Sequence, residues 1–308
     1  MSKPHKLVFF GNERLATGVS TDVPALRSLI EAGYDIQAVV ASHSEGVSRN
    51  KRGLEIVEIA HAYHIPILIP DKLEDIKDKL TKFGAEAGVL VAFGKIIPQE
   101  IIDVFPRGII NIHPSLLPAY RGPTPVETAI LEGIEQTGVS LMALTAKMDA
   151  GPVYIQESVK LKGDETKPQL AHKLLNLGTK LLVENLSYIL DGSLEAIPQD
   201  DTKATYTKLI TKADGLIDFK ESAYLIERRI RAYTDWPGCR TKIWGQDVII
   251  TKAHAVPVME EPAGTVEALK EGVLMLHARD GYVCVDELKP AGKKEMPAAD
   301  FIRGYKKS

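Results

Sequence analysis

The sequence has few cysteines and no long apolar run. Cys239 and Cys284 are its only two cysteines, too few for the disulfide framework of a small secreted domain. No stretch of 18 or more apolar residues occurs, so no transmembrane helix is expected. The apolar run at 7–10 is too short for a signal peptide. We therefore expect a cytoplasmic protein without a membrane association.

A strong excess of one charge sign is also missing. The 308 residues include 38 Lys and Arg against 41 Asp and Glu, a formal net charge of -3. This balance supports no broad claim for binding to nucleic acid or membrane. The hydrophobic share of 44% and the charged share of 26% are typical of a globular protein. The length predicts one large domain or two medium ones.

Residues 1 to about 145 alternate short apolar runs with longer amphipathic segments. The runs at 7–10, 36–40 and 87–92 indicate buried strands. Such alternation predicts an α/β fold with a Rossmann-like, doubly wound parallel sheet, in which ligands bind at the carboxyl ends of the strands. The first turn reads Gly11-Asn12-Glu13-Arg14 and not G-x-G-x-x-G. A dinucleotide such as NAD therefore has little support.

Asn111 and His113 stand two residues apart after the apolar run 108–110. In an extended chain two such side chains share a face, and Pro114 favours extended geometry at His113. A lone Asn-x-His pair is more often a capping or surface pair than a catalytic one. Here a stiff loop follows, and a second polar cluster at 148–152 ends the next apolar segment. Both features favour a site at the strand ends.

The longest motif in the chain is Asn111-x-His113-x-Ser115-Leu116-Leu117-Pro118-x-x-Arg121-Gly122, followed by Asp149-x-Gly151. This motif resembles the folate-dependent formyltransferase family. The resemblance implies the formyltransferase fold and transfer of a formyl group from 10-formyltetrahydrofolate to an amine, with no metal. It also implies that Asn111, His113 and Asp149 are catalytic. The motif does not name the acceptor, because family members act on a purine precursor, on amino sugars and on methionyl-tRNA.

The same resemblance implies where the folate lies. The expected contacts are Ser115, Leu116, Leu117, Pro118, Phe93 and Gly94. The segment 91–98 is an apolar strand that ends in a Pro-closed turn, and the backbone groups of such a turn can bind a flat heterocycle. Without the resemblance, a plain strand exit explains the turn equally well.

The segment 48–53 is a small basic loop. In the methionyl-tRNA formyltransferase family a basic loop at this place enters the acceptor stem, which implies tRNA contacts by Arg49, Lys51 and Arg52. The loop is shorter than the family's, and solvated charges are the alternative interpretation.

Two parts of the chain differ in texture. A helical pattern at 166–190 and a polar segment at 192–205 predict a catalytic domain at 1–191, a linker at 192–205 and a second domain at 206–308. Short strands expected at 216–219, 240–243, 247–251, 264–266, 272–276 and 282–288 predict an OB-like β-barrel. Several segments here, among them 236–238 and 288–296, resemble the C-terminal domain of the methionyl-tRNA formyltransferase family. The resemblance implies tRNA contacts by Lys293 and Lys294.

We therefore expect formyl transfer to methionyl-initiator tRNA in translation initiation, with no obligate protein partner. Asn111 and protonated His113 would stabilise the oxyanion of the tetrahedral intermediate, and Asp149 would assist proton transfer. One alternative is a sugar-nucleotide N-formyltransferase on the same scaffold. Another is a non-catalytic RNA-binding protein, against which the intact Asn111, His113 and Asp149 speak.

Overall fold

The computed structural model describes residues 4–11, 25–42, 55–257, 264–268 and 272–306. The chain forms two compact units. The first comprises 1–125, 136–160 and 170–208, and the second comprises 126–135, 161–169 and 209–308. Two short segments that precede residue 170 thus belong to the second unit, whereas the boundaries predicted from the sequence at 191 and 206 divide the chain only once.

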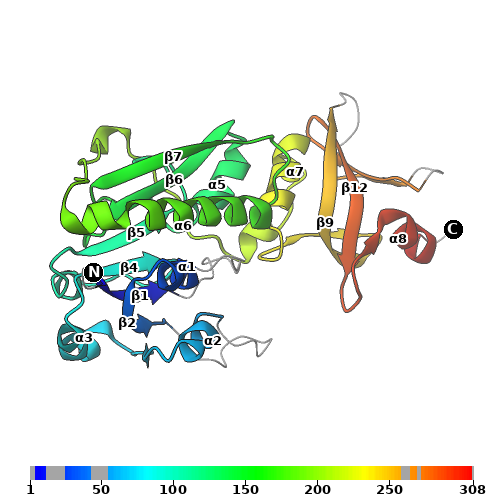
Figure 1. Ribbon diagram of the computed structural model, residues 1–308. Coiled ribbons are helices and arrows are strands. Elements are labelled where there is room, and N and C mark those ends of the chain that lie inside the picture. Colours follow the sequence, from blue (N-terminus) through cyan, green and yellow to red (C-terminus); the bar gives the residue numbers. More distant parts are fainter. Residues whose placement is uncertain (1–3, 12–24, 43–54, 258–263, 269–271, 307–308) are drawn as a thin grey trace. The chain divides into compact units, whose positions relative to one another are not determined.

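A seven-stranded sheet is the frame of the first unit, in the order β3-β2-β1-β4-β5-β6-β7 (Figure 1). Its strands are β1 (Lys6–Gly11), β2 (Asp35–Val40), β3 (Ile67–Leu68), β4 (Ala87–Val91), β5 (Ile109–His113), β6 (Gln136–Ala143) and β7 (Val153–Lys160). The first five are parallel, which confirms the doubly wound fold class. Strand β6 runs antiparallel to β5, and β7 runs antiparallel to β6. The connection 144–152 is too short for the crossover helix that a parallel pair requires.

Both faces of the central strands are covered. Val8 and Phe10 of β1 enter a core cluster with Leu80 and Ile101, while Leu7 and Phe9, which point the other way, are also 0% exposed. The helices of this unit are α1 (Ala25–Glu31), α2 (Glu55–Ala62), η1 (Leu73–Ile76), α3 (Lys77–Phe83), α4 (Gln99–Ile102), most of α6 (Lys167–Asp191) and η2 (Asp201–Lys203).

Helix α6 packs closely on the sheet of the first unit. A Cβ atom added at Gly178 in the middle of this helix would lie 2.4 Å from the side chain of Ile112 on β5. Of the five leucines expected to form its apolar stripe, Leu177 is half-buried, and the four at 170, 174, 181 and 182 are buried. The buried stripe anchors the helix over the strands that carry the polar motif.

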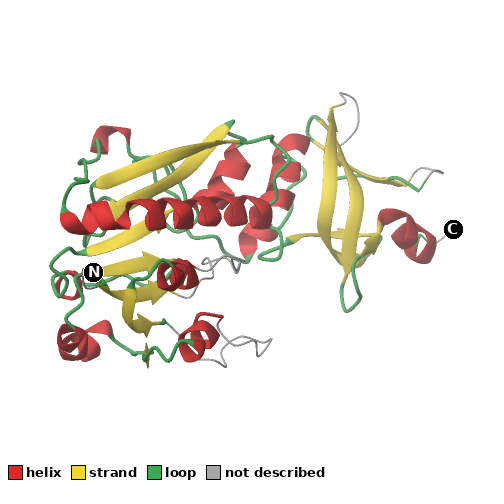
Figure 2. Cartoon of the chain, in the orientation of Figure 1, coloured by secondary structure: helices red, strands yellow, loops and turns green. Residues whose placement is uncertain are grey.

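The second unit is built on an antiparallel sheet (Figure 2). Its strand order is β10-β11-β12-β9-β8, with β13 beside β12. Its strands are β8 (Cys239–Ile243), β9 (Gln246–Pro257), β10 (Val266–Ala268), β11 (Leu274–Ala278), β12 (Gly281–Pro290) and β13 (Met296–Pro297). Its helices are η3 (Ala213–Gly215), α7 (Ala223–Ala232), α8 (Ala298–Tyr305) and nearly all of α5 (Pro125–Glu132).

The β-rich C-terminal fold expected from the sequence is confirmed, with one difference in detail. Among the described residues β8 and β10 stand at the two ends of the strand order and do not pair with each other, so the sheet forms a half-barrel. The strand expected at 216–219 is reduced to a single bridge between Leu216 and Arg240. Within the described part of the chain, no helix has the length and apolar character needed to cross a bilayer.

Candidate active site

Asn111 and His113 lie at the carboxyl end of β5 and share one face of it. Their neighbours on β6 are Met142 and Ser140, which fixes the register and hence the direction of both side chains. Asn111 is 6% exposed and His113 is 4% exposed. Two buried polar side chains at a strand end need partners or a function. The strand geometry expected from their spacing is therefore present.

Asp149 is brought to His113 from the loop between β6 and β7. Its Oδ2 atom lies 3.8 Å from Nδ1 of His113 and accepts a hydrogen bond of 2.7 Å from the backbone N–H of Gly122. The backbone of Asp149 is in the left-handed region, with φ of 48°. Aspartate is among the few residues that tolerate this conformation, which here turns the carboxylate back toward β5.

The hydrogen bonds of His113 define its neutral tautomer. Nε2 lies 3.0 Å from the backbone carbonyl of Tyr120, and a carbonyl can only accept, so Nε2 carries the hydrogen. Nδ1 is then the basic nitrogen, and it is the one that faces Asp149. A proton taken up at Nδ1 would turn this contact into an ion pair.

The side-chain amide of Asn111 differs from His113 in its hydrogen bonding. Asn111 is 6% exposed, and its side-chain amide forms no hydrogen bond with a described residue. An amide N–H kept unpaired beside a histidine is a donor that can serve a substrate atom.

The loop after His113 is held rigid by its own hydrogen bonds. The Ser115 hydroxyl donates to the Ala119 carbonyl at 2.6 Å, and the Ser140 hydroxyl donates to the Ser115 carbonyl at 2.6 Å. Gln156 donates to the Leu117 carbonyl at 2.8 Å. Ser115 and Leu117 are buried, while Leu116 and Pro118 are partly exposed. The loop thus offers a firm and partly apolar surface.

Phe93 and Gly94 take different parts in the turn after β4. The Phe93 ring is 1% exposed and packs edge-on against Phe10, with ring centroids 5.8 Å apart. Gly94 is exposed, with φ of 75°. The aromatic side chain therefore belongs to the core, and the surface of this turn is provided by backbone.

Three polar residues that the sequence did not assign to the site lie next to Arg121 of the motif. Arg121 is 1% exposed. Its partners Gln199 and Asp201 lie in the predicted linker at 192–205, and its partner Tyr206 follows directly after it. Nothing in the polar run 198–203 signals this role, because it has no apolar periodicity. Only the fold brings it to the loop after β5.

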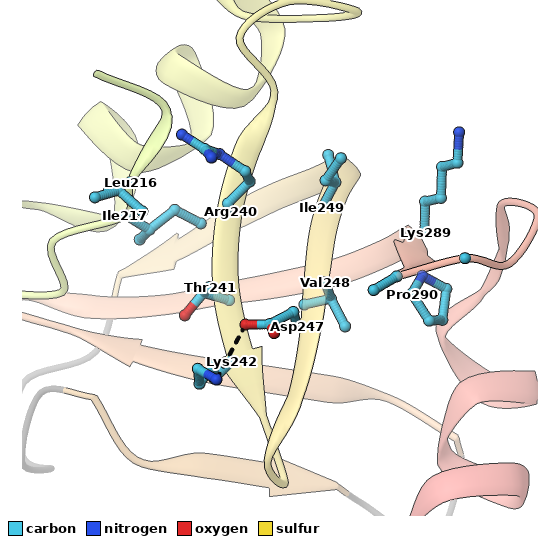
Figure 3. A pocket seen from close by; sticks show the side chains of 12 residues that line it. Leu216, Ile217, Arg240, Thr241, Lys242, Asp247, Val248, Ile249, Lys289 and Pro290 are labelled. Atoms are coloured by element: carbon cyan, nitrogen blue, oxygen red, sulfur yellow. Dashed lines mark ion pairs between the residues drawn. The ribbon is translucent and has the colours of Figure 1, made fainter. Parts of the chain in front are cut away.

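A cavity of about 650 Å³ lies in the second unit, at the β8–β9 hairpin and the end of β12 (Figure 3). Arg240, Ile249 and Lys289 are register partners on three neighbouring strands, so an apolar side chain stands between two cations. Lys242 and Asp247, also on its wall, form an ion pair of 3.2 Å. The cavity has no histidine or amide comparable to those of the first unit, and its character is that of a binding surface.

The basic residues predicted to contact tRNA fall into two groups, and a further basic cluster lies at 228–231. Lys293 and Lys294 are exposed and follow the wall of this cavity, and no described residue forms an ion pair with either. Arg49, Lys51 and Arg52 lie outside the described residues. Arg229 and Arg231, in the cluster at 228–231, are instead bound within the second unit by Glu221 and Glu227.

Neither cysteine is suited to nucleophilic chemistry. Burial raises the pKa of the Cys239 thiol to about 12, and burial together with the charge of Asp286 raises the pKa of Cys284. Since the thiolate is the reactive form, both remain protonated thiols. In the part of the chain that the structure describes, no group of three His, Cys, Asp or Glu side chains is placed to hold a metal ion.

Comparison with known families gives two matches in succession. A formyl transferase model matches residues 35–186, and a model of the formyl transferase C-terminal domain matches residues 209–306. The methionyl-tRNA formyltransferase of Roseiflexus castenholzii is 35% identical over 308 residues, which cover 98% of this chain and 96% of that protein. That of Halalkalibacterium halodurans is 37% identical over 312 residues, covering 97% and 94%.

Solved structures with low sequence identity share the fold. WlaRD, a sugar 3N-formyl transferase crystallised with dTDP and 5-N-formyl-THF, superposes with a TM-score of 0.69 at 19% identity, covering 95% of this chain and all of that one. HypX from Aquifex aeolicus, in complex with tetrahydrofolic acid, superposes with a TM-score of 0.63 at 17% identity. The match covers 99% of this chain, which spans about half of the HypX chain, 48%.

Proposed function

The chain belongs to the methionyl-tRNA formyltransferase family, and we propose that it transfers the formyl group of 10-formyltetrahydrofolate to the amino group of methionyl-initiator tRNA, with Asn111, His113 and Asp149 as its catalytic residues. The observation that carries the proposal is the pairing of His113 with Asp149 beside the buried amide of Asn111. Acyl transfer to an amine requires an oxyanion donor and a group that moves a proton.

The chemistry follows from the orientation of these groups. The amine attacks the formyl carbon, a C–N bond forms, and the carbonyl oxygen becomes an oxyanion to which the Asn111 amide donates. Such a donor contributes about 3 kcal/mol to the transition state. In place of the protonated oxyanion donor expected from the sequence, His113 acts here as the base, because its Nδ1 faces Asp149. It takes the amine's proton at Nδ1, where the Asp149 carboxylate stabilises the imidazolium, and returns it to the folate nitrogen as the C–N bond to folate breaks.

We place the folate across residues 115–118 and the turn at 93–94. The internal hydrogen bonds of the loop support this assignment, because a rigid surface loses little conformational entropy when a ligand binds. At the turn, the buried Phe93 ring and the exposed Gly94 assign the contact to backbone groups. The folate is a co-substrate here, and the proposed steps use neither a metal nor NAD.

We assign tRNA binding to the second unit and to the basic loop of the first. Lys293 and Lys294 are free of ion pairs within the described residues, and Arg240 and Lys289 line the cavity beside them. Cations of this kind bind phosphates with little regard to base sequence. Arg49, Lys51 and Arg52 are expected to position the acceptor end and so to affect kcat as well. The setting we propose is the cytoplasm, where charged initiator tRNA is used.

The test is formylation of purified methionyl-initiator tRNA with 10-formyltetrahydrofolate. The wild-type protein should produce formylmethionyl-tRNA, and His113→Ala should not. A parallel reaction offers a dTDP-amino sugar as the acceptor, because the fold is shared with sugar formyltransferases. Formylation of the sugar without formylation of the tRNA would replace the proposed acceptor. Tight tRNA binding without formylation of either acceptor would indicate a binding protein.

A further inference from the structure

We name the segment 199–207 the strap. It lies outside the sequence motif but forms hydrogen bonds to Asp149 and to Tyr120, the residue whose carbonyl contacts His113. It lies in the first unit. The Thr205 hydroxyl accepts a hydrogen bond of 2.8 Å from the Tyr120 backbone N–H, and the Tyr120 carbonyl is the partner of His113 Nε2. Gln199 reaches the other partner, since its amide donates to the Asp149 carbonyl at 2.8 Å.

Gln199 uses its whole amide group in this arrangement. Its nitrogen donates to the carbonyls of Asp149 and Gly151, at 2.8 and 2.6 Å. Its oxygen accepts from Nε and Nη2 of Arg121, at 3.0 and 2.8 Å. Because carbonyls only accept and guanidinium only donates, the orientation of the amide is unambiguous. An ionised glutamate, which has the same size, could accept these bonds but not donate them.

Arg121 and its neighbour Gly122 connect Gln199 to the other end of Asp149. Its guanidinium is held by Gln199, and its neighbour Gly122 donates its N–H to the Asp149 carboxylate. The backbone of Gly122 has φ of 112°, and an added Cβ would lie 2.7 Å from the Thr207 hydroxyl of the strap. Asp149 therefore accepts two hydrogen bonds, one at its backbone carbonyl from Gln199 and one at its carboxylate from Gly122.

The ion pair of Arg121 with Asp201 contributes less to this grip. It measures 2.7 Å, but the Asp201 side chain is 75% exposed. Exposed ion pairs are worth about 0 to 1 kcal/mol, whereas the partners at Gln199 are held at two points and partly shielded from water. The backbone of Arg121 is held by Thr205 and Thr207, and the Gln199 contact contributes more than Asp201 to holding its guanidinium.

We propose that Gln199, together with Arg121, is a positioning residue of the reaction: it holds the left-handed backbone of Asp149 so that the carboxylate faces Nδ1 of His113. This inference rests on the proposed function of the same site. Left-handed backbone in a non-glycine residue persists only where its surroundings enforce it, and the Gln199 bonds to the carbonyls of Asp149 and Gly151 supply that constraint. Displacement of a catalytic group by about 1 Å can cost about 100-fold in rate.

The decisive variant is Gln199→Glu. A carboxylate there keeps the size of the side chain and still accepts from Arg121, but it cannot donate to the Asp149 and Gly151 carbonyls. We expect kcat for formyl transfer to fall about 10- to 100-fold, with the KM for folate within about twofold of wild type. Gln199→Ala and Arg121→Lys should show similar losses of kcat. The matched control is Thr202→Ala, since that hydroxyl bonds only Asp200 within the strap; its kcat should be unchanged.

A second readout does not depend on any acceptor. The imidazole NMR signal of His113, assigned by its loss in His113→Ala, should shift in Gln199→Glu and Arg121→Lys but not in Thr202→Ala. If wild-type protein fails to formylate tRNA yet these shifts appear, the proposed function is wrong and the positioning role stands. Wild-type kcat and an unshifted His113 signal in Gln199→Glu would overturn the positioning role, as would a loss that merely follows a lower melting temperature.

Discussion

Arg121 and the strap residues of the first unit are hydrogen-bonded to one another, whereas Lys293 and Lys294 of the second unit form no ion pair with a described residue. Arg121 is 1% exposed and donates to three side chains. Lys293 and Lys294 are exposed and have no ion-pair partner among the described residues. Preorganised groups suit a transition state, because they need no rearrangement when charge develops. Mobile surface cations suit a polyanion, whose many phosphates they can meet at modest cost in entropy.

The largest expected effect tests the preorganised side of this contrast. Asn111→Ala, His113→Ala and Asp149→Ala should each lower kcat about 100-fold or more, since each removes an oxyanion or proton-transfer group. Single-turnover formylation under saturating tRNA measures this loss, and circular dichroism should show an unchanged fold. Any one of the three variants with near-normal turnover would remove that residue from the mechanism.

The second unit also contains a buried cation, Lys167. Like the buried Arg121 of the first unit, it should matter for the folded structure. The Lys167 amine, 0% exposed, donates to the Trp236 carbonyl at 3.0 Å. Burial lowers its pKa, against the charges of Glu127 and Asp235. Lys167→Ala leaves the buried Glu127 without this cation, so we expect unfolding to become easier by about 3 kcal/mol.

Urea unfolding of Lys167→Ala measures this difference, with Lys173→Ala as the control. The Lys173 side chain is exposed and, among the described residues, donates only to the Lys160 carbonyl at 3.3 Å. Its removal should therefore change the midpoint little. Equal midpoints for the two variants would show that burial does not make Lys167 important.

The exposed Lys293 and Lys294 should affect the KM for tRNA and its dependence on salt concentration. Lys293→Glu combined with Lys294→Glu should raise the KM for tRNA about tenfold with a smaller change in kcat, because it removes an interaction common to the ground and transition states. The difference should shrink as salt is raised from 50 to about 200 mM. The reversal of Lys79 and Lys82, two exposed lysines of α3, is the control. If kcat falls and KM does not change, these lysines act in the chemistry, contrary to our assignment.

The smallest effect concerns a buried group that has no part in either function. The pKa of Cys239 is raised to about 12 by burial, so between pH 9 and 12 the unfolded chain loses this proton while the folded chain keeps it. Stability should therefore fall as the pH rises through this window, by at most about 1.4 kcal/mol per pH unit from this residue. Cys239→Ala should show a shallower decline in chemical unfolding at pH 9 to 10.5, without loss of formyl transfer. An identical decline in both proteins would mean that the thiol ionises in the folded state.

Local patterns predicted much of the fold and the centre of the site. The apolar runs of β1, β2 and β4 and the leucine spacing of α6 are properties of adjacent residues, and the structure has these elements at the expected places. The Asn111 and His113 pair follows from the two-residue repeat of a strand. The resemblance of the motif to a known family was also carried by contiguous residues, and the family is confirmed.

Other features depend on residues that are distant in the sequence. The segment at 192–205 is polar and aperiodic, which is typical of a linker, yet its Gln199 bonds to Asp149 and Arg121. The arginines at 228–231 form a basic cluster in the sequence, yet Glu221 and Glu227 bind two of them. The segment 216–219 has the composition of a strand and makes only one bridge. In each case the outcome was set by a partner that no local pattern identifies.

The sequence by itself determined which elements form and which residues stand at the end of β5, because periodicity and backbone preference act over a few residues. The tertiary structure alone decided that Asp149 faces His113, that Gln199 and Gly122 hold it there, and that Lys293 stays free while Arg229 does not. Those facts depend on which groups meet after the chain has folded. A buried polar group must find its partner wherever the fold places one, and the distance along the chain carries no information about that meeting.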